Sequence, residues 1–211
     1  MTADPRATDP LPTDPRTTDP RETLNRALDT AGLVVARITP DQASLPTPCE
    51  SWNVGTLANH LINGLDRFRV AAVGETPDWS QPMPDVDGDW AGEFRVRSEA
   101  LAAAWASVPD IGATRSTGLG DVPISFVVTQ QIAEVAQHTW DLATATGQRD
   151  LPDEAVATEA LAWARQALKP EFRGPESEGK AFGAEHQIAD DAPAPDRLAA
   201  FFGRDPSFRA V

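Results

Sequence analysis

Apolar residues recur at intervals of three and four along most of this chain, a spacing that is typical of the buried face of an α-helix. The pattern predicts a first helix over residues 22–38, which is followed by the helix-breaking Pro40. A second helix is predicted over residues 53–73, where Gly74 provides a stop. Its apolar stripe is regular throughout and consists of Val54, Leu57, Leu61, Leu65, Phe68 and Ala72.

The same spacing continues in the second half of the chain. A third helix is predicted to end near Pro109, with an apolar face made of Phe94, Leu101 and Trp105. The fourth helix is predicted from Pro123, which suits a first helical turn, to Gly147, which suits a C-cap. One face of this helix contains Ile124, Val128, Ile132, Val135 and Leu142.

The remaining segments are shorter or irregular. Further helices are predicted over residues 153–168 and 196–202, whereas residues 75–93 and 109–122, rich in Pro, Asp and Gly, are predicted to be loops. No strand is strongly indicated, although residues 181–188 are compatible with an extended conformation. The pattern therefore predicts an all-α fold, a helical bundle with an additional helical and irregular segment at its C-terminal end.

The first twenty residues have a different composition. Thr-Asp-Pro recurs at Thr8, Thr13 and Thr18, and apolar residues are nearly absent. Because proline removes backbone donors and little apolar surface offsets the entropy of ordering, residues 1–20 are predicted to form a disordered arm. Residues 21–211 are then expected to form a single domain.

The net charge of the chain argues against some classes of binding partner. The chain has 18 Lys and Arg against 32 Asp and Glu, and its net charge of −14 argues against binding to nucleic acid or to anionic membranes. No apolar run reaches the roughly 20 residues of a membrane span, and a secretory signal pattern is absent. We therefore expect a cytoplasmic protein. Its single cysteine, Cys49, cannot form an intramolecular disulfide, which fits a reducing compartment.

The candidate chemistry lies on the second and fourth predicted helices. Glu134 and His138 are one helical turn apart, so their side chains project from one surface with about 40° between them. His138 falls at the border of the apolar face of its helix, and His60 has a similar place on the second helix. Two imidazoles and one carboxylate are the ligand set of catalytic zinc sites, which keep a fourth position open.

Spacing alone leaves a second interpretation open. A Glu and a His at this interval occur often by chance, and a histidine at an apolar border is commonly a hydrogen-bonded residue without a metal. Two of the three histidines lie at the inner borders of long helices, which favours the metal site. The third, His186, lies in a loop-like region and is predicted to be solvated.

Three sequence motifs then indicate a family. The chain contains Pro46-Thr-Pro-Cys-Glu-Ser-Trp52-Asn-Val with Leu57-Ala-Asn-His60-Leu, then Glu134-Val-Ala-Gln-His138-Thr-Trp140-Asp141-Leu-Ala-Thr-Ala-Thr-Gly147, and finally Asp196-Arg-Leu-Ala-Ala-Phe-Phe-Gly-Arg204-Asp-Pro206. These segments resemble the mycothiol-dependent maleylpyruvate isomerase-like proteins, which belong to the DinB-like helical bundles. The third motif resembles an actinobacterial subgroup, mostly without assigned activity, that lacks the isomerase's extra C-terminal domain.

The resemblance implies a DinB-like four-helix bundle in which His60, Glu134 and His138 hold a divalent metal, most typically zinc. In the isomerase-like enzymes the metal activates a low-molecular-weight thiol, because a coordinated thiol gives up its proton and becomes a nucleophilic thiolate. The implied cofactors are therefore a divalent metal and mycothiol.

Further residues are candidates for the proposed chemistry. Arg97, at the border of the apolar face of the third helix, is the candidate for binding a carboxylate of the substrate or the thiol. Asp141 is the candidate for orienting an imidazole, and Gln131 lies on the same stripe. Asp141 is equally compatible with a structural hydrogen bond. Cys49 is assigned no catalytic role, and core packing is the favoured role of the two tryptophans that adjoin the ligand helices, Trp52 and Trp140.

The leading functional hypothesis is a metal-dependent and thiol-dependent transferase or isomerase that acts on an electrophilic small molecule. Two alternatives remain open at this stage. One is a module that binds metal or a small ligand without turnover, and the other is a metal-assisted hydrolase, for which no separate carboxylate base is evident. The sequence leaves open the substrate, the identity of the metal and whether the chain forms a homodimer.

Overall fold

The computed structural model describes residues 19–209, apart from residues 79, 83, 87, 118–119, 176–177, 179 and 181. Most of the predicted arm, residues 1–18, lies outside the described residues. Its last two residues start the first helix, α1 (Pro20–Ala36). Asp19 is the N-cap and accepts a hydrogen bond from the backbone N–H of Arg21, while Pro20 takes a first-turn position that needs no donor.

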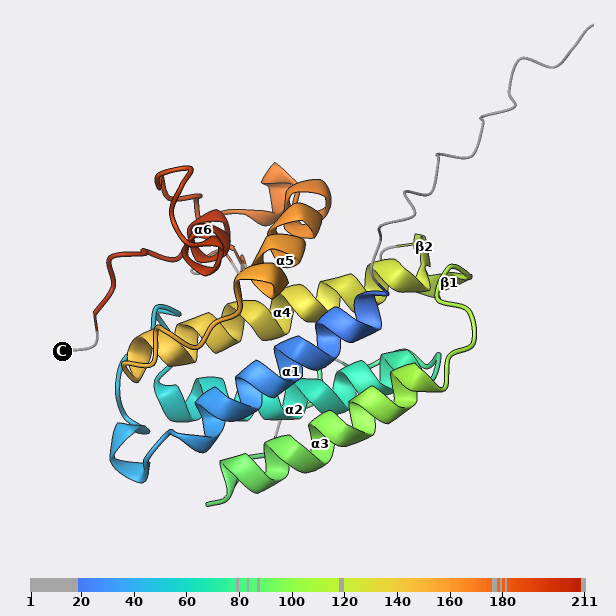
Figure 1. The fold of residues 1–211 in the computed structure, drawn as a ribbon, viewed down its shortest axis with the longest axis horizontal. Coiled ribbons are helices and arrows are strands. Elements are labelled where there is room, and N and C mark those ends of the chain that lie inside the picture. The colour runs from blue at the N-terminus through green and yellow to red at the C-terminus, as the bar shows by residue number, and fades with distance from the viewer. Residues whose placement is uncertain are drawn as a thin grey trace, which may run out of the picture.

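Four long helices form the bundle, and Figure 1 shows them side by side. They are α1, α2 (Val54–Ala72), α3 (Trp90–Ala106) and α4 (Ile124–Ala145). Helix α1 packs against α3 and α4, and α2 packs against the same two helices, so the four enclose a common core. The largest fully buried apolar side chains in that core include Leu24, Leu57, Ile62, Phe94, Leu101, Trp105 and Ile132.

The directions of the helices follow from contacts between them. Arg97 on α3 hydrogen-bonds Asn63 on α2, and Trp90, at the start of α3, reaches Asn59 near the start of α2. Helices α2 and α3 are therefore parallel, and the connection between them runs back along the bundle. Arg21 at the start of α1 donates to the carbonyl of Val108 after α3, so α1 and α3 are antiparallel.

Two more helices cover the bundle on one side. Helix α5 (Glu154–Ala167) packs on α4, and the short helix α6 (Ala194–Phe201) packs on both α4 and α5. In Figure 1 they form an additional layer against α4, on the side away from α2 and α3. Trp140 on α4 is buried beneath this layer, and its indole N–H donates to Asp196 of α6 at 2.8 Å. The all-α, DinB-like bundle with an additional C-terminal segment is thereby confirmed.

The two predicted loops differ from the structure. Residues 109–122, predicted to be a loop, contain part of an antiparallel hairpin of β1 (Thr114–Thr117) and β2 (Gly120–Pro123). The two strands lie mostly exposed and lack an apolar alternation, so the hydrophobic pattern contained no signal for them. Pro123 ends β2, and α4 starts only at Ile124.

The loop predicted over residues 75–93 is also shorter than expected, because α3 begins at Trp90. Asp89 caps that helix by accepting from the N–H of Gly92. Residues 182–188 form no strand, although Phe182 makes an isolated bridge with Arg173. Among the described residues, no helix is long and apolar enough to cross a membrane.

Candidate metal centre

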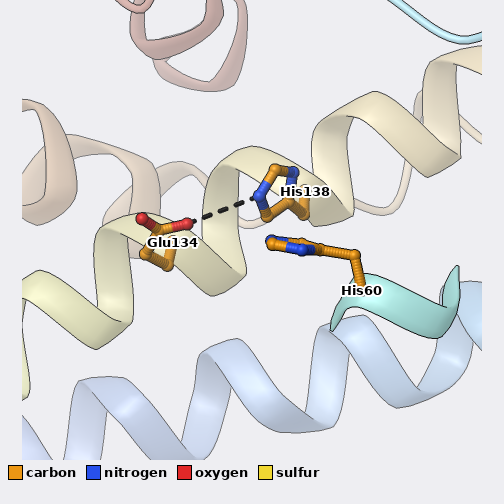
Figure 2. A group of neighbouring side chains, drawn as sticks. All are labelled: His60, Glu134 and His138. Atoms are coloured by element: carbon orange, nitrogen blue, oxygen red, sulfur yellow. Dashed lines mark ion pairs between the residues drawn. The ribbon is translucent and has the colours of Figure 1, made fainter. Parts of the chain in front are cut away.

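Helices α2 and α4 bring together the three predicted ligand residues. His60, Glu134 and His138 each offer a ligand atom, and these atoms all lie within 4.8 Å of one another. Nε2 of His138 lies 3.4 Å from a carboxylate oxygen of Glu134, and the His60 ring approaches them from α2 (Figure 2). The group lies at the edge of the buried interior, since the His138 side chain is 10% exposed and that of Glu134 is 40% exposed.

The surroundings of the two imidazoles shift their pKa values in opposite directions. Burial, together with the charge of His138, lowers the pKa of His60 to about 4. Burial also opposes a charge on His138, but its interactions with Asp141 and Glu134 outweigh the burial and raise the pKa of His138 to about 9. The pKa of the Glu134 carboxyl is lowered, because His138 outweighs the effect of burial there. At neutral pH the metal-free group therefore holds a neutral His60 and a charged His138–Glu134 pair.

The second nitrogen of His138 is fixed by a buried carboxylate. Its Nδ1 donates to Oδ2 of Asp141 at 3.3 Å, and the Asp141 side chain is completely buried. The other oxygen of Asp141 accepts from Gln137 at 3.2 Å and from Nε of Arg204 at 3.3 Å. The imidazole is thus held with Nε2 directed towards Glu134.

An indole ring covers both imidazoles. The ring centroid of Trp52, just before α2, lies 4.4 Å from that of His60 and 6.1 Å from that of His138. The two imidazole rings lie edge to face at 4.9 Å. Such contacts restrict the rotation of both rings. Trp52 also packs against the hydrophobic core, which is the role predicted for it from the sequence.

The donor set fits a borderline metal ion. Imidazole nitrogen and carboxylate oxygen are ligands of Zn²⁺ and related divalent ions, and three protein ligands leave a position open for another molecule. A histidine ligand whose second nitrogen donates to a carboxylate is typical of such sites. Ligands bound at about 2 Å lie within roughly 4 Å of each other, so the atoms need only a small contraction to reach one ion.

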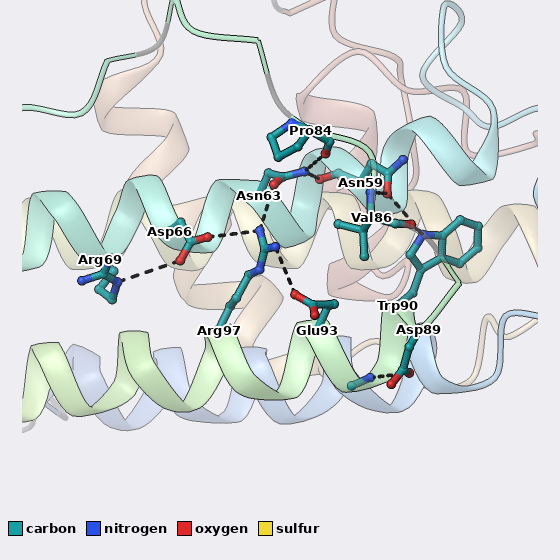
Figure 3. A network of polar contacts seen from close by, with 11 residues as sticks. Asn59, Asn63, Asp66, Arg69, Pro84, Val86, Asp89, Trp90, Glu93 and Arg97 are labelled. Carbon is teal, nitrogen blue, oxygen red and sulfur yellow. Dashed lines mark hydrogen bonds and ion pairs between the residues drawn. The ribbon is translucent and has the colours of Figure 1, made fainter.

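Arg97, the predicted carboxylate-binding residue, lies in a different polar network (Figure 3). Its guanidinium donates to the side-chain oxygen of Asn63 at 2.8 Å and pairs with Asp66 and Glu93, each at 3.1 Å. The Arg97 side chain is 19% exposed. These contacts join α3 to α2 and include none of the three candidate ligands, so the role of Arg97 in binding a substrate stays a prediction.

The other residues named in the sequence analysis lie outside the group of three candidate ligands. Gln131 is buried and accepts from the indole N–H of Trp105 at 2.7 Å, which joins α4 to α3 inside the core. Sγ of Cys49 accepts from Arg204 at 3.5 Å. His186 is exposed, as predicted.

Arg204 is the residue that the sequence interpretation missed at this centre. It follows α6 in the chain, and its side chain, 12% exposed, contacts both Asp141 and Cys49. Helical periodicity cannot place a residue in an irregular C-terminal segment. The available signal was the position of Arg204 within the third motif.

Comparison with known proteins identifies the family to which the chain belongs. Residues 24–143 match the mycothiol maleylpyruvate isomerase N-terminal domain, which is more than half of the chain and includes all three candidate ligands. The chain belongs to this family. It is also 35% identical to uncharacterized proteins from two strains of Mycobacterium tuberculosis, CDC 1551 and H37Rv, over 85% of this chain and 94% of each relative. No solved structure matches it significantly.

Membership in the mycothiol maleylpyruvate isomerase N-terminal domain family makes the protein a mycothiol-related member of the DinB-like bundles, a group with metal-binding sites. The matched region ends at residue 143, within α4. Helices α5 and α6 and Arg204 therefore lie beyond the region that defines the family.

Proposed function

We propose that this protein is a metal-dependent enzyme that uses mycothiol, or a thiol of the same class. The enzyme either transfers the thiol to an electrophilic small molecule or isomerises that molecule. The observation that carries the proposal is the meeting of His60, Glu134 and His138 within 4.8 Å, in a family named for a mycothiol-dependent activity. Zinc is the ion that the ligand set favours.

The chain's own residues have distinct roles in this proposal. His60, Glu134 and His138 hold the ion, and Asp141 keeps the His138 ring in the orientation that directs Nε2 towards Glu134. A bound divalent ion supplies Lewis acidity, which lowers the pKa of a thiol so that thiolate is present at neutral pH. Trp52 shields one side of the two imidazoles from water.

The metal content of the protein tests the first part of the proposal. Tag-free protein purified without chelator is expected to hold close to one equivalent of divalent metal by elemental analysis. His60→Ala and His138→Ala each remove a ligand and are expected to lose most of it. His186→Ala is the matched control, because this third histidine is exposed and lies apart from the group. Native protein that stays metal-free after incubation with zinc contradicts the proposal.

Thiol dependence separates the enzyme hypothesis from its alternatives. The metal-loaded protein is expected to consume mycothiol, or to depend on it catalytically, when supplied with electrophiles such as maleylpyruvate. The same reaction should be lost in His138→Ala and retained in His186→Ala. Turnover by water without thiol would favour the metal-assisted hydrolase, whereas stoichiometric metal without any product would favour a non-catalytic binding module.

A further inference from the structure

The segment that follows α6 approaches the candidate metal centre through the side chain of Arg204, which contacts Asp141. Gly203 directs the chain there, with a φ of +86° and a backbone so close to Gly183 that a Cβ would lie 2.6 Å from it. Both features require glycine. The next residue, Arg204, donates its own backbone N–H to the carbonyl of Ala199 at 2.9 Å, which closes the end of the helix.

The Arg204 guanidinium joins two elements that carry the site. Its Nε donates to Oδ1 of Asp141 on α4 at 3.3 Å, and its Nη2 donates to Sγ of Cys49 at 3.5 Å. Cys49 belongs to the turn that precedes α2, where its carbonyl accepts from the N–H of Trp52 at 2.9 Å. The same arginine therefore contacts the partner of His138 and the turn that presents Trp52 to both imidazoles.

The positive charge of Arg204 pairs with the buried carboxylate of Asp141. A completely buried carboxylate such as Asp141 needs compensating donors, and Arg204 is the cation that pairs with the oxygen turned away from His138. Gln137, the other donor to that oxygen, is neutral and cannot balance the charge. Without Arg204, the Asp141 carboxylate would lose its charged partner and be free to turn, so its hydrogen bond to Nδ1 of His138 would weaken.

The geometry points to Arg204 as a positioning residue of the metal centre, which acts through Asp141 on His138 and makes the segment after α6 part of the site. The relevance of this role to metal binding rests on the proposed function. The contacts themselves concern the metal-free chain and can be tested without metal.

Three variants separate positioning from simple anchoring of the segment. Arg204→Ala removes both contacts, whereas Arg204→Lys keeps a positive charge but lacks the fork that spans two acceptors. Arg149→Ala is the matched control. Arg149 holds the same segment, since it donates to the carbonyls of Pro206 and Phe208 at 3.0 and 3.3 Å, and its guanidinium lies over the Trp140 ring rather than at Asp141.

The first readout is the side-chain ¹H–¹⁵N spectrum of His138 in metal-free protein, assigned with His138→Ala. Arg204→Ala is expected to shift the His138 resonances, Arg204→Lys to shift them less, and Arg149→Ala to leave them in place. Melting temperatures of all variants identify any that fail to fold. Unchanged His138 resonances in folded Arg204→Ala, or equal shifts in Arg149→Ala, would overturn the positioning role.

The second readout is the affinity for zinc by chelator competition, together with the visible spectrum of the Co²⁺ form. Loss of partners outside the ligand shell reduces metal affinity by about 10–100-fold, so Arg204→Ala is expected to lose about tenfold and to alter the Co²⁺ bands. Native affinity and spectrum in this variant would contradict the role at the metal. Native protein without metal binding would refute the proposed function, and the spectrum of His138 would still decide the positioning role.

Discussion

His60 and His138 face one another from neighbouring helices, yet their environments favour different protonation states. His60 has burial and a neighbouring positive charge against its protonation, whereas His138 lies between two carboxylates that favour it. Since a metal binds the neutral form of imidazole, His60 is already in its binding state at neutral pH. His138 must first release the proton on Nε2, while its Nδ1 keeps the hydrogen bond to Asp141.

Zinc binding is therefore expected to release about one proton at pH 7 and to strengthen as the pH rises. Between about pH 6 and 8, below the pKa of about 9 of His138, each unit of pH is expected to raise the affinity about tenfold, because one proton competes with the ion. His60, with a pKa of about 4, adds no competition in this range. Calorimetry in two buffers of different ionisation enthalpy measures the proton release. An affinity independent of pH would contradict the assigned charge state.

At this scale the sequence predicted the candidate ligands but not their surroundings. Glu134 and His138 could be paired because four residues make one turn of a single helix. Joining His60 to them required a family resemblance, because periodicity says nothing of which helices adjoin. The contact of Arg204 with Asp141 depends on the path of an irregular segment, for which no local pattern exists.

The elements that carry the site are held in register by polar contacts as well as by the core. Arg97 is the centre of one such set, since it ties α3 to both Asn63 and Asp66 on α2. Asn63 is itself buried and donates to the carbonyls of Asn59 and Pro84, so the network also fixes the connection that leads back to α3 (Figure 3).

Replacement of Arg97 by alanine is expected to destabilise the fold by about 1–2 kcal/mol, because Asn63 loses a charged hydrogen-bond partner while the two carboxylates remain partly solvated. Chemical denaturation measures this change, and metal content is expected to stay native. Arg95→Ala, on the same helix but with an exposed pair to Glu99, is the control and should change stability little. A loss of turnover in Arg97→Ala at native stability would instead support the substrate-binding role predicted from the sequence.

The helices were predictable to within a few residues where an apolar stripe and a stop signal coincide, as in α2, whose N-cap is Asn53. Prediction failed for the β1–β2 hairpin. Arg115 on β1 donates to backbone carbonyls at the end of α2, so the position of the hairpin depends on a contact between distant segments. An exposed strand with such an anchor has no hydrophobic pattern of its own.

Across the whole molecule, negative charge greatly exceeds positive charge. With a net charge of −14, we expect repulsion between surface carboxylates to outweigh the attraction of the exposed ion pairs, each of which contributes little. The melting temperature is therefore expected to rise by a few degrees between low ionic strength and about 0.3 M NaCl, as the screening length shortens. Scanning fluorimetry with NaCl and KCl checks this, and the two salts should act alike. A steady fall with salt would show that attractive pairs dominate.

The division of the candidate ligands between α2 and α4 also bears on how the chain acquires its fold. Glu134 and His138 can approach an ion as soon as α4 forms, but His60 joins them only when α2 docks on α4. On the proposed function, tight metal capture is expected to be a late event of folding, and the rate at which a refolding chain takes up Co²⁺ is expected to report the closure of the bundle. The same dependence predicts that a bound ion stabilises the native state selectively, since the unfolded chain lacks the assembled site.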